Sequence, residues 1–115
     1  MTDEFKLGDQ EAIVLQAVAV LPPDQAYGIP IMDFVTEATG KEPALGALYT
    51  VLARLEKKGF VTWRMSEPTA ERGGRRKKIY EIEAAGQRAL TEKFNQLDRR
   101  VSILRPLRTR IGDVA

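Results

Sequence analysis

The sequence contains no cysteine and no histidine. Without cysteine the chain can form neither disulfides nor thiolate-based zinc sites, and it has no thiol nucleophile. Without histidine it lacks the commonest general base and the commonest ligand of transition metals. We therefore expect no catalytic residue, no metal site and no cofactor, and we expect that the protein is not an enzyme.

Long apolar runs are also missing, as is a signal-peptide pattern. A membrane-spanning helix needs about 18 or more consecutive apolar residues, and no such stretch occurs. The hydrophobic fraction of 43% and the charged fraction of 30% are typical of a globular protein. We expect a cytoplasmic protein with no membrane partner, whose 115 residues form one compact domain with an appendage.

The charge is distributed unevenly along the chain. The net charge is only +2, but residues 1–50 contain two basic residues against eight acidic ones, so residues 51–115 carry +8. A basic second half favours a polyanionic partner. A solvated basic surface is the alternative that charge alone leaves open.

Three segments of the first half have the apolar spacing of helices. The first is expected from Asp9 to Leu21, and the second from Gly28 to Gly40, where the glycine can end the helix. The third is expected from Ala44 to Lys58, with Gly59 turning the chain in a left-handed conformation. The apolar residues of the third helix that we expect to face the core are Leu45, Leu48, Tyr49, Leu52 and Leu55.

After Gly59 the apolar residues recur with a period of two. This pattern predicts antiparallel strands over residues 60–65 and 78–82, joined by a long basic loop. The glycines and cations of this loop, which we expect to contact phosphates, are Arg72, Gly73, Gly74, Arg75, Arg76 and Lys77.

The last helix is expected from Ala84 onward, and its apolar residues recur at alternating steps of four and three. That spacing is typical of a coiled-coil seam, so we expect the helix to form a homodimer. The seam residues are Leu90, Phe94, Leu97, Val101 and Leu104. Pro106 is expected to end the helix.

The order helix, helix, helix, strand, strand predicts a winged helix-turn-helix fold, which is α+β and mainly helical, followed by a long C-terminal dimerisation helix. In this fold the third helix enters the major groove of double-stranded DNA, and the hairpin, or wing, lies over phosphates. We expect residues 1–83 to form the DNA-binding domain, residues 84–106 the dimerisation helix and residues 107–115 a flexible tail. The residues expected to face DNA from the third helix are Ala47, Thr50, Arg54 and Lys58.

Each of these interpretations has an alternative. Arg54 can instead pair with Glu56 or Glu42, and a charged loop is often only solubilising. The alternative function is a winged-helix module that uses its basic wing to bind an acidic protein partner.

Several motifs resemble the PadR-type transcriptional regulators in their order along the chain. The similar segments are Leu7–Gly8 with Glu11, Ala26–Ile29, Ala47–Gly59, Glu71–Lys78, Tyr80 and Gly86. The resemblance covers about Leu7 to Leu104 and is to the short form with a single C-terminal helix. It implies a homodimer that binds a palindromic operator and usually represses a nearby gene until a small-molecule effector weakens binding. Members of this family that bind drugs have a tryptophan where this chain has Leu97, which argues against a flat aromatic effector between subunits.

Overall fold

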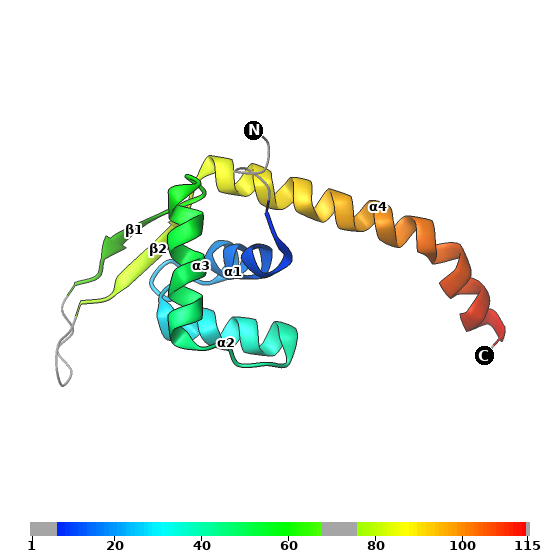
Figure 1. Ribbon diagram of the computed structural model, residues 1–115, viewed down its shortest axis with the longest axis horizontal. Coiled ribbons are helices and arrows are strands. Elements are labelled where there is room, and N and C mark those ends of the chain that lie inside the picture. The colour runs from blue at the N-terminus through cyan, green and yellow to red at the C-terminus, as the bar shows by residue number, and fades with distance from the viewer. Residues whose placement is uncertain (1–6, 68–75, 115) are drawn as a thin grey trace.

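The computed structural model describes the backbone of residues 7–67 and 76–114 and the side chains of residues 7–67 and 76–101. Three helices form one body, with a two-stranded hairpin on one side and a long helix extending from the other (Figure 1). This arrangement confirms the predicted α+β, mainly helical, winged helix-turn-helix fold. The elements are α1 (Asp9–Val20), α2 (Gly28–Thr39), α3 (Leu45–Lys57), β1 (Val61–Met65), β2 (Lys78–Ile82) and α4 (Ala84–Val114).

The first helix, α1, is the centre of the core. It contacts α2, α3, α4 and β2. Burying each large aliphatic side chain contributes about 1.5–3 kcal/mol, so this shared core holds the elements around α1. The largest fully buried side chains are Val14, Leu15, Ile31, Leu48, Leu52 and Leu55.

The buried face of α3 is rotated from the face that we predicted. Leu48, Leu52 and Leu55 are buried as expected, and so is Val51, which we did not place in the core. Leu45 and Tyr49 are each 42% exposed, so their assignment to the core is wrong. Each residue advances an α-helix by about 100°, which puts these two side chains at the edge of the buried stripe.

Two glycines have the left-handed backbone conformation expected of them. Gly40 (φ 77°) caps the C-terminus of α2, and Gly59 (φ 80°) follows α3. The Phe60 backbone N–H then donates to the Leu55 carbonyl (2.9 Å), which keeps Phe60 in the turn and delays the start of the strand to Val61. The wing therefore begins directly at the end of α3.

The two strands are antiparallel, with Trp63 opposite Tyr80. The sheet is attached to the helical body through β2, because the Tyr80 backbone N–H donates to the Ala26 carbonyl at 2.8 Å. Farther out, the Ser66 N–H donates to the Lys77 carbonyl at 2.7 Å. These hydrogen bonds fix the base of the wing beside the loop that precedes α2.

The last helix, α4, is longer than predicted. Its backbone is helical for 31 residues, so the prediction that Pro106 ends the helix is wrong, and residues 107–114 of the predicted tail belong to α4. Proline removes one donor and displaces one carbonyl, which can bend a helix rather than end it. Figure 1 shows α4 projecting away from the body and bending towards its C-terminal end. Among the described residues, no helix has the apolar length needed to cross a membrane.

Candidate functional site

The outward face of α3 carries three of the four residues that we predicted to face DNA. Ala47, Thr50 and Arg54 are all exposed. The Thr50 hydroxyl donates to the Gly46 carbonyl at 3.0 Å, so it keeps its lone pairs for an external donor. These side chains, spaced by three and four residues, lie on one side of the helix.

Arg54 is the cation best placed to contact a ligand from this face. It forms no ion pair with any residue that the structure describes. The alternative partner Glu56 instead accepts a hydrogen bond from the Trp63 indole nitrogen at 3.0 Å. The Arg54 guanidinium therefore retains its donors for a group with two acceptor atoms, such as a guanine edge or a phosphate.

Lys58 follows Arg54 by four residues, but its ammonium turns towards Glu11 of α1. Its side chain is 17% exposed, and its Nζ lies 3.0 Å from both carboxylate oxygens of Glu11. One residue earlier, Lys57 is exposed and shares the outward side with Thr50 and Arg54. Lys57 and Lys58 follow Arg54 by three and four residues, so both flank the predicted DNA-facing side, and Lys58 as a DNA contact stays a prediction.

Glu11 is the only charged residue buried among those that the structure describes, with 7% of its surface exposed. Burial raises the pKa of its carboxyl, but the Gly8 backbone N–H (2.9 Å), the Lys58 ammonium and the charge of Arg54 outweigh burial and leave the pKa below its ordinary value. The carboxylate is therefore ionised and fully hydrogen-bonded at neutral pH.

Only the base of the predicted wing is described. Arg76 and Lys77 are exposed there, and the Lys77 Nζ lies 4.9 Å from the centre of the Tyr27 ring, next to the first residue of α2. The next lysine, Lys78, lies 4.2 Å over the Trp63 ring. The remaining predicted phosphate contacts lie outside the described residues; they are Arg72, Gly73, Gly74 and Arg75.

The predicted seam of α4 divides between two environments. Leu90 is 7% exposed and belongs to the core of the chain itself. Phe94, Leu97 and Val101 are 41%, 37% and 39% exposed. The side chain of Leu104 lies outside the described residues. The apolar surface that α4 presents to solvent therefore starts at Phe94, one turn beyond the core.

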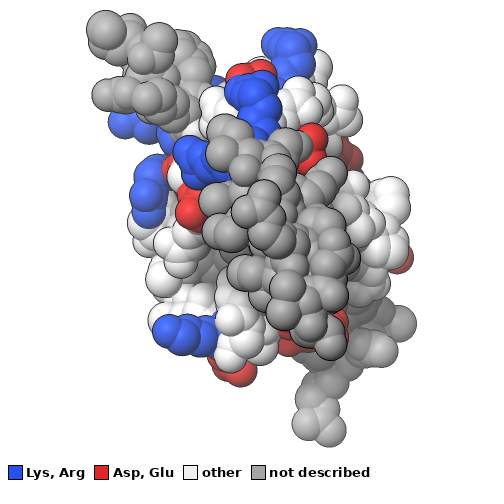
Figure 2. All heavy atoms as spheres, turned by 90° about the vertical axis from the view of Figure 1, so that its right-hand side faces the viewer, with Lys and Arg blue, Asp and Glu red and all other residues white. Residues whose placement is uncertain are grey.

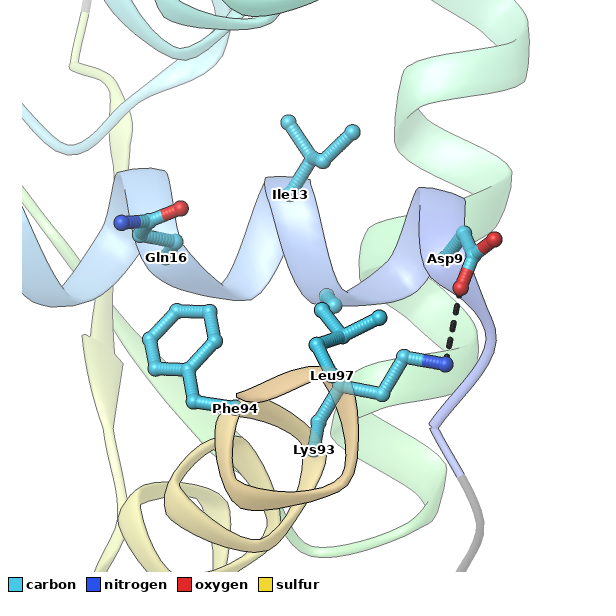
Figure 3. A pocket seen from close by; sticks show the side chains of 7 residues that line it. Asp9, Ile13, Gln16, Lys93, Phe94 and Leu97 are labelled. Atoms are coloured by element: carbon cyan, nitrogen blue, oxygen red, sulfur yellow. Dashed lines mark ion pairs between the residues drawn. The ribbon is translucent and has the colours of Figure 1, made fainter. Parts of the chain in front are cut away.

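A pocket of about 370 Å³ lies between α1 and α4, and sequence reasoning missed the contribution of α1 to it. Figure 3 shows the side chains of both helices around the pocket, with the ion pair of Asp9 and Lys93 (2.8 Å) at one end. The hydrogen bond and the charge of Lys93 hold the pKa of the Asp9 carboxyl below its ordinary value. The lining residues are Asp9, Ala12, Ile13, Gln16, Lys93, Phe94 and Leu97.

The charges around the projecting helix are mixed. Figure 2 views the molecule from the side towards which α4 projects and shows Lys and Arg interspersed with Asp and Glu over the described part of this face. Exposed cations lie on the outward face of α3 and at the base of the wing; they are Arg54, Lys57, Arg76 and Lys77.

Comparison with known proteins identifies the fold and the family. A model described as the Transcriptional regulator PadR-like family matches residues 18–92. A PadR family transcription regulator from Clostridium difficile is similar in structure, with a TM-score of 0.71 and 20% identity over 87% of this chain and 98% of that chain. A PadR-like transcriptional regulator from Bacillus cereus gives a TM-score of 0.68 and 18% identity over 84% and 88% of the two chains. A transcriptional regulator from Clostridium thermocellum has a TM-score of 0.66 and 21% sequence identity, covering 84% of this chain and 87% of that chain. No curated protein sequence matches this chain significantly.

Proposed function

This chain belongs to the PadR-like family of transcriptional regulators, and from that premise we propose that it binds a palindromic operator in double-stranded DNA as a homodimer and represses transcription. The observation that carries the proposal is the outward face of α3. There the exposed guanidinium of Arg54 has no ion-pair partner among the described residues and lies on the same side as Thr50.

We assign base recognition to α3. An arginine can donate two hydrogen bonds to guanine O6 and N7, and a threonine can contact a phosphate or a thymine methyl group. Ala47 is small and exposed, so it allows the helix to approach the base edges closely. Lys57 replaces Lys58 as the lysine that we expect to reach the DNA from the end of this helix.

Phosphate binding is assigned to the wing. Arg76 and Lys77 are exposed at its base, and Lys77 lies next to the N-terminus of α2, where the helix dipole adds positive potential. We keep the predicted phosphate contacts of the outer wing in this role; they are Arg72, Gly73, Gly74 and Arg75. Such contacts add affinity for any DNA sequence, whereas α3 distinguishes among sequences.

A second copy of the chain is the occupant that we propose for the groove between α1 and α4. Phe94, Leu97 and Val101 are large, exposed and aligned along α4, and the helix extends beyond its own body. Side chains with coiled-coil spacing can pack against the same helix of a second copy, which buries apolar surface on both copies. Each copy of α3 would then read one half-site of the operator, and such half-sites are about 34 Å apart, one helical turn of DNA.

A binding titration with DNA from beside its own gene tests the proposal. We expect a shift at or below micromolar protein in moderate salt. Arg54→Ala should change the preference among operator variants, because it removes a base contact. Replacing Arg76 and Lys77 by glutamine should instead weaken binding to all sequences and reduce the slope of log K against log salt by about 0.9 per lost phosphate contact.

Arg88→Ala is the matched control, since Arg88 is an exposed cation on α4 and belongs to neither proposed set of DNA contacts. It should leave both the sequence preference and the salt slope unchanged. The proposal is wrong if no DNA binds at micromolar protein. Capture of an acidic protein by the wing in place of DNA would favour the protein-interaction alternative.

A further inference from the structure

Two acidic residues in the first turn of α1 each bind a lysine from a different helix. Asp9 pairs with Lys93 of α4 at 2.8 Å, and Glu11 pairs with Lys58, which directly follows α3, at 3.0 Å. These four residues, the α1 junction, connect the helix that we propose to read bases with the helix that we propose to form the dimer.

The Glu11–Lys58 pair is the buried half of the junction. The two side chains are 10% and 17% exposed, and both carboxylate oxygens accept from the Lys58 ammonium. Glu11 also accepts from the Gly8 backbone N–H, so the carboxylate is held on two sides. Removing either partner of a largely buried ion pair is costly, which makes the pair sensitive to substitution.

The ends of the two helices favour this pairing. A carboxylate near the N-terminus of α1 and an ammonium at the C-terminus of α3 each interact favourably with the dipole of the nearby helix end. The pair therefore fixes the end of α3 against the start of α1, while the buried leucines of α3 fix only its inward face. The angle at which α3 packs on α1 therefore depends on both the ion pair and the buried leucines.

We propose that Glu11 and Lys58 are positioning residues, which set the orientation of α3 relative to α4 and do not touch DNA. This inference rests on the proposed function, because orientation matters only if two α3 helices must match two half-sites. In a dimer joined through α4, a change in the tilt of α3 alters the distance between the two recognition helices. Loss of the pair should therefore weaken binding and reduce the preference for one half-site spacing.

Glu11→Gln separates a positioning role from an electrostatic one. It removes a negative charge, so it would strengthen DNA binding if only net charge mattered. We expect it to weaken operator binding about tenfold instead, with Lys58→Met giving a similar loss and the double variant little more, because both break one interaction. The salt slope should be unchanged in all three.

Lys57→Met is the matched control, as the neighbouring lysine on the same helix. It should reduce the salt slope by about one and leave the half-site spacing preference intact. If Glu11→Gln tightens binding, or if Lys58→Met reduces the salt slope as Lys57→Met does, Lys58 is a phosphate contact and the positioning role is refuted. Lys58→Gln, which keeps a donor for the carboxylate, replaces Lys58→Met if that variant does not fold.

A distance measurement without DNA tests the geometry independently of the proposed function. The chain has no native cysteine, so spin labels can be attached to Ala53→Cys on α3 and Asn95→Cys on α4, both exposed positions. Dilution with unlabelled protein isolates distances within one chain. Glu11→Gln should shift or broaden the distance distribution, and Lys57→Met should not. An unchanged distribution in Glu11→Gln overturns the inference, whereas a changed distribution in a protein that binds no DNA supports it and rejects only the proposed function.

Discussion

Gly86 occupies a point where the first turn of α4 crosses the start of the wing. It is buried, and a Cβ at this position would overlap the Phe60 carbonyl oxygen. The close approach is reinforced by the Glu83 N–H, which donates to the same carbonyl at 2.8 Å. A single hydrogen atom in place of a side chain thus allows α4 to pack on the body.

Gly86→Ala should destabilise the protein by about 1–3 kcal/mol, because the backbone oxygen it meets cannot move without shifting the chain. The measurement is the midpoint of urea unfolding followed by circular dichroism. Gly46→Ala is the control, since a Cβ there meets nothing within 4 Å and the residue lies in α3. It should be neutral or stabilise by up to about 1 kcal/mol. Equal effects of the two substitutions would contradict the packing argument.

At the scale of elements, the sequence predicts which segments are helices better than it predicts which way they face. The spacing of the leucines places α3 correctly, yet Leu45 and Tyr49 are exposed and Val51 is buried. The spacing of apolar residues identifies a helix. Which residues lie at the centre of its buried face depends on the elements that pack against it.

The same limit applies to the contacts around the candidate site and to the last helix. Lys57 and Lys58 are neighbours in the sequence, and the pairing of Lys58 with Glu11, 47 residues earlier, is a contact that no local pattern shows. At Pro106 the prediction relied on the local preference of proline, whereas the helical turns on both sides continue through it. Leu90 and Phe94 share one heptad pattern, but only Leu90 is buried in the core of the chain, whereas Phe94 is 41% exposed.

The Glu11 carboxyl should make stability depend on acid pH. Its folded-state pKa lies below the ordinary value of 4.5, so the interaction stabilises the fold above that value and is lost as pH falls through the folded-state pKa. Gly8, Lys58 and Arg54 supply the groups that face it. We expect the urea midpoint of Glu11→Gln to decline less than that of the wild type between about pH 5 and pH 3.

Asp9→Asn is the comparison for this experiment. Lys93 also lowers the pKa of the Asp9 carboxyl, but the Asp9 side chain is 84% exposed. Solvent screens an exposed pair, so Asp9→Asn should change the pH dependence little. A decline of Glu11→Gln as steep as that of the wild type would contradict the assignment to Glu11.

At the scale of the whole molecule, α4 carries a row of large apolar side chains that its own chain leaves exposed. Phe94, Leu97 and Val101 begin where contacts with the core end, and the pocket beside α1 continues the same surface. Exposed apolar residues in such a row are typical of an interface with another copy.

Leu97→Glu combined with Val101→Glu should convert a dimer to monomers, because two charges per chain would be buried without partners. Sedimentation velocity at micromolar concentration gives the oligomeric state, and operator affinity should fall in parallel. Asn95→Glu, on the opposite side of α4, is the control and should leave the dimer intact. A wild type that sediments as a monomer at this concentration would refute the proposed interface.

Because α4 is long, a small rotation near the body displaces its far end by several ångströms. Its 31 residues extend about 46 Å at 1.5 Å per residue. A rotation of about 5° where Gly86 meets Phe60 would displace the far end of a straight lever of that length by about 4 Å. A disturbance of the α1 junction would be magnified in the same way, so the position of the far end of α4 depends most on the few contacts nearest Gly86.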